Sequence, residues 1–329
     1  MPAGKLINIA PFLSPWFLSV LLLILYDYQS ETVTRDSEKH VNVSNFPGNK
    51  NTFNLPFKSA GRLFITDAVI DGVAGNLVFD SGTTEIVLNR TYFRNYARTE
   101  TTGQKGITGN VNDVEKINIG EINISGLRFR RIEASLSDLS HIENRRGVKI
   151  LGIFGFELLK DFEITIDAVN NQMELSGTTS EERVRKMEWN KKVPDVVLKT
   201  EIRKNIVFLQ GEVAGLPLKF CLDTGAEISV ISSRCPKQVL NTFSVDRKVT
   251  LKGAGTATNE VLYGKLKELR FGKHSVNSFE TIVAGLDGLG EAYGMKIDGM
   301  LGYNFLKEAV IRINFAEGRT SLWFNKNLQ

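Results

Sequence analysis

The chain carries one sequence pattern twice. "LVFDSGTTEIVL" at residues 77–88 and "FCLDTGAEISVI" at residues 220–231 each place an acid, a hydroxyl residue and a glycine between two apolar runs. Each half later carries a G-x-x-G pair, at Gly152 and Gly155 and at Gly299 and Gly302. The second glycine of the pair follows the acid by 75 residues in the first half and by 79 in the second. A duplication with nearly constant spacing restricts the fold to two copies of one structural module.

Each copy has the pattern of an all-β fold. From Leu55 onward, short alternating apolar runs are broken by Gly, Asn and Asp, which is typical of strands and turns. "RLFITDAVIDGVAGNLVFD" predicts a hairpin with a strand near Leu63–Ile70, a turn around residues 71–76 and a second strand into Asp80. Residues 205–223 repeat this hairpin, and in both copies a glycine stands eight residues before the acid, at the expected turn. Helix is expected only in short segments such as "GFELLKD" and "GYNFLKEA".

The repeat and the composition divide the chain into five predicted parts. They are an N-terminal membrane anchor or signal segment (1–30), a flexible tether (31–52), a first lobe (53–177), a charged linker (178–192) and a second lobe (193–329). The tether is polar and poor in large apolar residues. A chain of 329 residues is long enough for each lobe to bury its own core.

The N-terminal segment has the length of a membrane span. Residues 7–26 carry no charged side chain, and as a helix they would extend roughly 30 Å, the thickness of the bilayer's hydrocarbon core. Lys5 precedes the segment and Asp27 follows it, so the rest of the chain is expected to be exported. The alternatives are a cleaved signal peptide, for which no small-residue cleavage site follows, and a buried core helix, for which no amphipathic stripe is visible. The predicted localisation is membrane-anchored or periplasmic/extracytoplasmic.

The composition excludes several classes of function. The 41 basic and 37 acidic residues are mixed and give a net charge of +4, so nucleic-acid binding is not expected. The three histidines and two cysteines lack metal-binding spacing, so neither a metal nor a cofactor is expected. Cys221 lies in an apolar run and is predicted to be a small core residue, while its pairing with Cys235 is left open. The absence of a G-x-S-x-G motif argues against a serine hydrolase.

The two repeated acids, Asp80 and Asp223, each follow a run of apolar strand residues. A carboxylate at the end of a buried strand is costly unless something compensates it. A single such acid would be explained well enough as a structural turn residue. Two acids in a duplicated module can meet across a pseudo-twofold axis, and carboxyls about 3 Å apart share one proton. Such a pair can accept a proton from water and donate one to a substrate carbonyl, which predicts hydrolysis without a metal or a covalent intermediate.

These motifs resemble those of the aspartic peptidases, specifically the retropepsin-like family of exported bacterial aspartyl proteases. The resemblance covers residues 55–327 and rests on "DSG" at 80–82, "DTGA" at 223–226, "IFG" at 153–155 and "MLG" at 300–302. It implies two tandem retropepsin-like β-barrel lobes related by pseudo-twofold symmetry, with each later element beneath an Asp loop in a ψ-shaped core. The implied roles are catalysis by Asp80 and Asp223, a hydroxyl grip between the lobes by Ser81 and Thr224, and support of the dyad by Gly82 and Gly225.

The resemblance also implies two flaps, near residues 103–109 and 253–255, that close over an extended substrate. Neither contains the tyrosine that pepsin-like enzymes place there, which favours the retropepsin type with both lobes in one chain. The two copies differ beside the motifs, with Leu151 in place of Asp298 and Thr83 in place of Ala226.

The predicted function is therefore that of an aspartic endopeptidase. An Asp-Asp dyad would activate water and hydrolyse peptide bonds of an extended polypeptide substrate, without a cofactor and as a monomer. One alternative is a catalytically silent module that keeps the acid protease fold and binds a peptide or a cell-surface component. Another is that each lobe pairs with its counterpart in a second chain.

Overall fold

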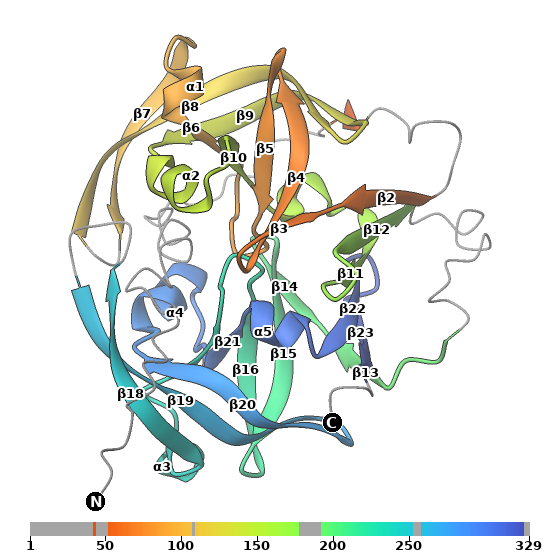
Figure 1. The fold of residues 1–329 in the computed structure, drawn as a ribbon, viewed down its shortest axis with the longest axis vertical. Coiled ribbons are helices and arrows are strands. Elements are labelled where there is room, and N and C mark those ends of the chain that lie inside the picture. The colour runs from red at the N-terminus through yellow and green to blue at the C-terminus, as the bar shows by residue number, and fades with distance from the viewer. Residues whose placement is uncertain (1–41, 44–51, 107–108, 178–191, 253–257, 326–329) are drawn as a thin grey trace, which may run out of the picture.

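The computed structural model describes residues 42–43, 52–106, 109–177, 192–252 and 258–325 (Figure 1). The predicted N-terminal segment at 1–30 lies outside the described residues, as do most of the tether at 31–52 and of the linker at 178–192. In the part of the chain that is described, no helix is both long enough and apolar enough to cross a bilayer. The membrane anchor stays a prediction, and so do the lobe boundaries at 53–177 and 193–329.

Eight described strands of the first lobe form a nine-stranded sheet together with β1. The strands are β1 (Asn42–Val43), β3 (Lys58–Ala60), β4 (Leu63–Ile70), β5 (Val73–Phe79), β6 (Val87–Asn89), β7 (Arg98–Gly106), β8 (Gly109–Ile124), β9 (Leu127–Ser137) and β10 (Ile150–Phe154). Their order is β1-β9-β6-β10-β5-β4-β8-β7, with β3 paired to β4. The pairs β5–β10 and β6–β9 are parallel, and β10–β6 is antiparallel.

The second lobe repeats this topology within its described residues. Its sheet contains β14 (Glu201–Arg203), β15 (Ile206–Val213), β16 (Leu216–Leu222), β17 (Ser229–Ser232), β18 (Phe243–Lys252), β19 (Thr258–Phe271), β20 (His274–Ala284) and β21 (Gly299–Leu301). The order is β14-β15-β16-β21-β17-β20-β19-β18, with the parallel pairs β16–β21 and β17–β20 at the places equivalent to those of the first lobe. The predicted all-β class with two related lobes is confirmed.

Each lobe begins with the predicted hairpin. The first strand is β4, with the predicted bounds Leu63–Ile70, and the turn is shorter than predicted because only Asp71 and Gly72 separate it from β5. Both turn residues have positive φ, 43° and 85°, as do Ala214 and Gly215 at the equivalent turn, 54° and 77°. Such two-residue turns match the twist of the flanking strands, and the second position favours glycine.

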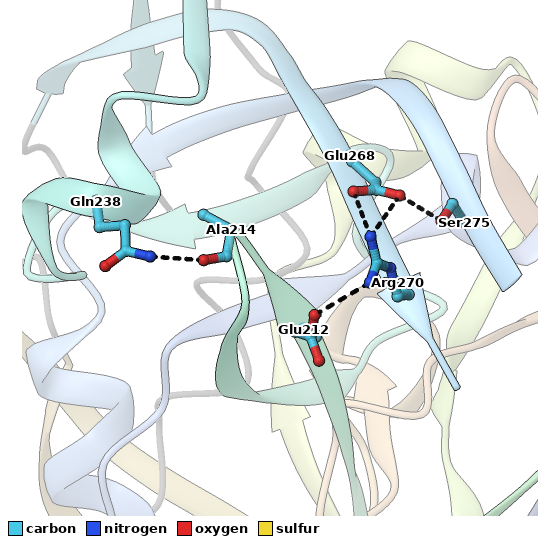
Figure 2. Close-up of polar contacts among 6 residues, drawn as sticks. All are labelled: Glu212, Ala214, Gln238, Glu268, Arg270 and Ser275. Atoms are coloured by element: carbon cyan, nitrogen blue, oxygen red, sulfur yellow. Dashed lines mark hydrogen bonds and ion pairs between the residues drawn. The ribbon is translucent and has the colours of Figure 1, made fainter. Parts of the chain in front are cut away.

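An additional strand pairing closes each sheet on itself. In the first lobe β8 pairs with β9 as well as with β4, and in the second lobe β19 pairs with β15, at Glu212 and Arg270, as well as with β20. Figure 2 shows the guanidinium of Arg270 donating to the carboxylates of Glu212 and Glu268, the second of which also accepts from the Ser275 hydroxyl. These groups are partly exposed, so the contacts are expected to fix the register of the closure more than to stabilise the fold. Nearby, the Gln238 amide of α3 (Lys237–Leu240) donates to the carbonyl of Ala214 in the hairpin turn.

A third sheet joins the two lobes. Its described strands are β2 (Thr52–Pro56), β11 (Phe162–Asp167), β12 (Gln172–Gly177), β13 (Val196–Lys199), β22 (Ala309–Asn314) and β23 (Arg319–Phe324). The order is β13-β23-β22-β11-β12-β2, with three strands from each lobe. Equivalent strands of the two lobes lie at the same distance on either side of the centre, which is the antiparallel pair β11–β22. Figure 1 shows this sheet beside the two lobes. The central pair lies at the pseudo-twofold axis that the duplication predicted.

The helices in the described part of the chain are short. They are α1 (Arg90–Phe93), α2 (Ser140–Arg146), α3, α4 (Asp287–Tyr293), α5 (Tyr303–Leu306) and the 3-10 helix η2 (Phe156–Leu158). The two segments predicted to be helical contain η2 and α5. The pair α2 and α4 was not predicted, and each of these helices ends at a glycine in the left-handed conformation, Gly147 with φ 66° and Gly294 with φ 62°.

The hydrophobic core follows the duplication. One main cluster contains residues of both lobes, among them Phe79 and Phe154 of the first and Phe220 and Leu301 of the second. A smaller cluster lies beneath α2 and another beneath α4, with side chains from equivalent strands in each case. The continuous main cluster, together with the shared sheet, fixes the lobes to each other and so determines how their Asp loops meet.

Candidate active site

The same strand arrangement positions both acids. Asp80 follows β5 and Asp223 follows β16. In the first lobe β10 lies between β5 and β6, and in the second lobe β21 lies between β16 and β17. The N–H of Asp80 donates to the carbonyl of Phe154 at 2.8 Å, and the N–H of Asp223 donates to the carbonyl of Leu301 at 2.9 Å. The later motif therefore lies beside the Asp loop and holds its backbone, as the resemblance implied.

The last glycine of each G-x-x-G pair is required by close backbone packing. A Cβ at Gly155 would lie 2.7 Å from the carbonyl oxygens of Asp80 and Thr83. A Cβ at Gly302 would lie 2.7 Å from the carbonyl oxygen of Ala226. Real Cβ atoms do not approach a backbone oxygen so closely, so these two positions of the repeated motif require glycine.

Four hydrogen bonds cross between the two Asp loops. The Ser81 N–H donates to Thr224 Oγ1 at 2.8 Å, and the Thr224 N–H donates to Ser81 Oγ at 2.9 Å. The Ser81 hydroxyl then donates to the carbonyl of Leu222, and the Thr224 hydroxyl to the carbonyl of Phe79, both at 3.0 Å. Each hydroxyl thus satisfies two buried backbone groups of the opposite lobe, and the two loops are held in one relative position.

This arrangement brings the carboxyl groups of Asp80 and Asp223 together. The Gly82 N–H donates to Asp80 Oδ1 at 2.9 Å, and the Gly225 N–H donates to Asp223 Oδ1 at 2.8 Å. A Cβ at Gly225 would lie 2.3 Å from Asp80 Oδ2, and one at Gly82 would lie 2.9 Å from Asp223 Cγ, so each carboxyl contacts the glycine of the opposite loop. Both Oδ2 atoms are buried, and neither has a hydrogen-bond partner among the described residues.

Burial raises both pKa values, and repulsion adds to the effect at Asp80. Burial, followed by the charge of Asp223, raises the pKa of Asp80 well above its ordinary value of 3.8. Burial also raises the pKa of Asp223, to about 6, against the opposing effects of the neighbouring Asp80 carboxyl and of the Gly225 and Ala226 N–H groups. Only Asp223 accepts from two N–H groups of its own loop, the second being Ala226 at 3.1 Å. These two donors favour the negative charge on Asp223 and the shared proton on Asp80.

The raised pKa values predict how stability depends on pH. Because the folded state holds a proton that the unfolded chain loses near pH 3.8, the pair's contribution to the free energy of unfolding falls as pH rises toward about 6 and beyond. Replacing Asp80 with Asn removes the coupled titration. We expect the variant to gain stability relative to the wild type between pH 4 and pH 7. Urea unfolding of both proteins at these two pH values measures the difference, and a difference that is the same at both would contradict the shared proton.

A buried ion pair also crosses between the lobes. Glu227, the residue after "DTGA", is 6% exposed and accepts from the guanidinium of Arg146 on α2. Arg145 lies 3.7 Å from the same carboxylate oxygen, and Arg62 donates to the Glu227 carbonyl at 3.3 Å. Three arginines of the first lobe thus surround one glutamate of the second. None of these residues was predicted, although the position of Glu227 directly after the motif was a signal that could have been used.

Neutralising this glutamate is expected to weaken the attachment of the lobes. Glu227→Gln keeps the shape of the side chain but leaves the Arg146 charge without a counter-charge, and we expect a loss of about 1–2 kcal/mol in the free energy of unfolding. Glu260→Gln is the matched control, because the ion pair of Glu260 with Lys248 is largely exposed and its loss should cost less than about 0.5 kcal/mol. Urea unfolding at pH 7 compares the two, and equal losses would contradict a stabilising role for the cross-lobe pair.

The remaining predictions for the site concern flaps, cysteines and metals. The flap near 103–109 falls in the hairpin of β7 and β8, of which residues 107–108 lie outside the described part. Residues 253–255 are likewise not described and fall between β18 and β19. Cys221 and Cys235 are both buried free thiols, so they do not pair. The described residues contain no cluster of His, Cys, Asp and Glu that could hold a metal ion.

Comparison with known proteins finds similarity in sequence and in structure. Residues 209–305 match the family model described as aspartyl protease. No curated protein matches the sequence. Among solved structures, a retropepsin-like aspartic protease from Rickettsia conorii is similar at 20% identity, with 38% of this chain and 90% of that chain covered and a TM-score of 0.28. Basic 7S globulin from soybean is similar at 10% identity, with 83% of this chain and 95% of that chain covered and a TM-score of 0.48. The sequence similarity to the aspartyl protease family thus covers residues 209–305 of the second lobe, which contain Asp223, Gly299 and Gly302.

Proposed function

We propose that the protein is an aspartic endopeptidase in which Asp80 and Asp223 form the catalytic dyad. The observation that carries the proposal is the meeting of two fully buried carboxyls from two equivalent loops, each in contact with the glycine of the opposite loop. A structural role alone would not require two acids whose charges repel each other in a buried site. The proposed substrate is an extended polypeptide, which fits the aspartyl protease family.

The proposed reaction uses one shared proton. The Asp223 carboxylate takes a proton from a water molecule, whose oxygen attacks the carbonyl carbon of the scissile bond, while Asp80 gives its proton to the carbonyl oxygen. The product of this step is a neutral gem-diol. In the second step one diol hydroxyl returns a proton to Asp80, Asp223 gives its proton to the amide nitrogen, and the C–N bond breaks. The dyad then again holds one proton, on Asp80.

The test of the proposed function is proteolysis by the purified full chain. Wild-type protein is incubated with a mixture of denatured proteins from pH 3 to pH 8, and the new amino termini are identified by mass spectrometry. Cleavage within chains, with activity falling at the pH where the shared proton is lost, is the expected result. If peptides bind but no new termini form at any pH, the chain is a binding module and the proposed function is wrong.

We also propose that the enzyme acts as a monomer and is exported. A single chain supplies both acids and both hydroxyls of the grip, which supports an intramolecular site. Activity that is proportional to enzyme concentration, with a monomer mass in sedimentation, is expected. Residues 7–26 support export or anchoring through their uncharged length, and fractionation of cells that express the chain with and without this segment tests it.

A further inference from the structure

Tyr293 is a buried tyrosine at the edge of the proposed active site. It is the last residue of α4 and is 8% exposed. Its ring packs edge-on against Phe208 of β15, with the centroids 5.7 Å apart. The backbone turns immediately after it, because Gly294 adopts the left-handed conformation with φ 62°. The end of the helix and the packing of the ring against Phe208 therefore set the direction of the Tyr293 side chain.

The hydroxyl of Tyr293 reaches the opposite lobe. It donates to the carbonyl of Gly82 at 3.5 Å. Gly82 is the residue whose N–H donates to Asp80 Oδ1, and a Cβ on it would lie 3.0 Å from both carboxylate oxygens of Asp223. Tyr293 thus contacts the first Asp loop at the residue that touches both acids.

The equivalent position of the first lobe has the same geometry with a different side chain. α2 ends at Arg146, directly before the left-handed Gly147, as α4 ends at Tyr293 before Gly294. Arg146 also crosses to the opposite lobe, where its guanidinium donates to Glu227, close behind the second Asp loop. The last residue of this helix therefore supports the opposite Asp loop in both lobes, by a charge in one case and by a phenol in the other.

The electrostatic environment keeps the phenol protonated. Burial, and then the nearby Cys221, Asp223 and Asp80, raise the pKa of Tyr293. Ionisation of Tyr293 would place a second negative charge beside the dyad and is therefore disfavoured. The Tyr293 hydroxyl can thus act as a donor at every pH at which the dyad holds one proton. The carbonyl of Gly82 is an acceptor within its reach.

We propose that Tyr293 is a positioning residue of the peptidase reaction, which holds the Gly82 peptide so that the Asp80 carboxyl stays aligned with that of Asp223. The inference rests on the proposed function, because it assigns Tyr293 a role in that site. The rest of the Tyr293 side chain packs in a cluster of buried apolar residues that includes Phe208 and Ala226. Removal of the hydroxyl makes the surroundings of the dyad less favourable for charge, so the first ionisation of the pair moves to higher pH.

The test is Tyr293→Phe, which keeps the ring and removes the hydroxyl. The expected result is a fall in kcat of about tenfold with KM unchanged within about twofold, because a misplaced carboxyl slows the chemical step more than substrate binding. The acid limb of the kcat profile is expected to rise by about half a pH unit. The matched control is Tyr92→Phe, which also loses a hydroxyl hydrogen bond, to Glu143 at 2.6 Å, but one that lies within the first lobe and outside the site. Wild-type kcat in Tyr293→Phe, or an equal loss in both variants, would overturn the proposal.

A second readout separates this inference from the proposed function. The dyad is titrated by carbon-13 NMR of labelled Asp carboxyls in the wild type and in Tyr293→Phe, which requires no turnover. If the wild type cleaves no peptide, the proposed function fails. An upward shift of the pair's first pKa in the variant would still support contact of Tyr293 with the acids, whereas identical titrations would refute the inference whether or not the protein is active.

Discussion

Asp80→Asn and Asp223→Asn are each expected to lower kcat by at least about a thousandfold, because the two carboxyls exchange one proton and neither can complete the cycle alone. The structural basis is the pairing of the buried carboxyls across the lobes, each with one N–H donor from its own glycine. An amide in place of either acid can still occupy the site but can neither take a proton from water nor return one. The double variant is expected to be no slower than the single ones, since groups that act as a unit are not additive.

Measurement of kcat for peptide cleavage by the two variants is paired with a control at an acid outside the site. Asp67→Asn is suitable, because Asp67 lies on the exposed part of β4 and its side chain is paired with Lys58. It should retain wild-type activity. Cleavage by Asp80→Asn at the wild-type rate would show that the dyad does not carry the reaction, and any observed activity would then have to come from elsewhere.

The same variants address the alternative of a silent binding module. Removing one of two buried acids abolishes their repulsion, so Asp80→Asn is expected to fold and to be at least as stable as the wild type at neutral pH. Its loss of activity could then not be attributed to unfolding. A wild type without turnover, combined with unchanged peptide binding by Asp80→Asn, would favour the binding module, because binding alone does not use the ionisation of the pair.

The sequence predicted those features of the fold that depend on local pattern. The β4–β5 hairpin was predicted with the correct first strand because alternating apolar residues and a glycine at the turn are local signals. The duplication predicted that two Asp loops would be equivalent, and the close packing at Gly155 and Gly302 gives the physical reason for the repeated glycines. The predicted turn was too long only because "GVAGN" contains two further turn-forming residues that β5 incorporates.

Features that depend on distant contacts were not predictable from one sequence. The six-stranded sheet pairs Ile164 with Ile313 across the lobes, and no pattern in either strand names its partner. The helices α2 and α4 are seven residues each, too short for a helical period to stand out. For the same reason the cross-lobe contacts of Arg146 and Tyr293 were missed, since each side chain was directed to its partner by the end of a helix that was itself not predicted.

Thr224→Val is expected to cause the largest loss of stability, about 2–6 kcal/mol, although valine has nearly the shape of threonine. Thr224 Oγ1 accepts from the Ser81 N–H and donates to the Phe79 carbonyl, both of them buried groups of the other lobe. Valine satisfies neither, and each buried polar group left without a partner costs about 1–3 kcal/mol. The free energy of unfolding in urea measures the loss, at a pH where the dyad holds one proton.

The matched control for this variant is Thr281→Val, which changes the same atoms at an equally buried site. The Thr281 hydroxyl donates to one carbonyl, that of Ser229, within its own lobe at 2.9 Å, so one group and not two is left unsatisfied. Its loss should be about half as large. Only Thr224→Val should also reduce kcat, because the Asp loops are aligned through the hydroxyls that join them. Equal losses of stability, with unchanged kcat in both variants, would contradict this prediction. They would mean that the shared sheet and core alone fix the lobes, and that the four cross-lobe hydrogen bonds do not determine how the two acids are arranged.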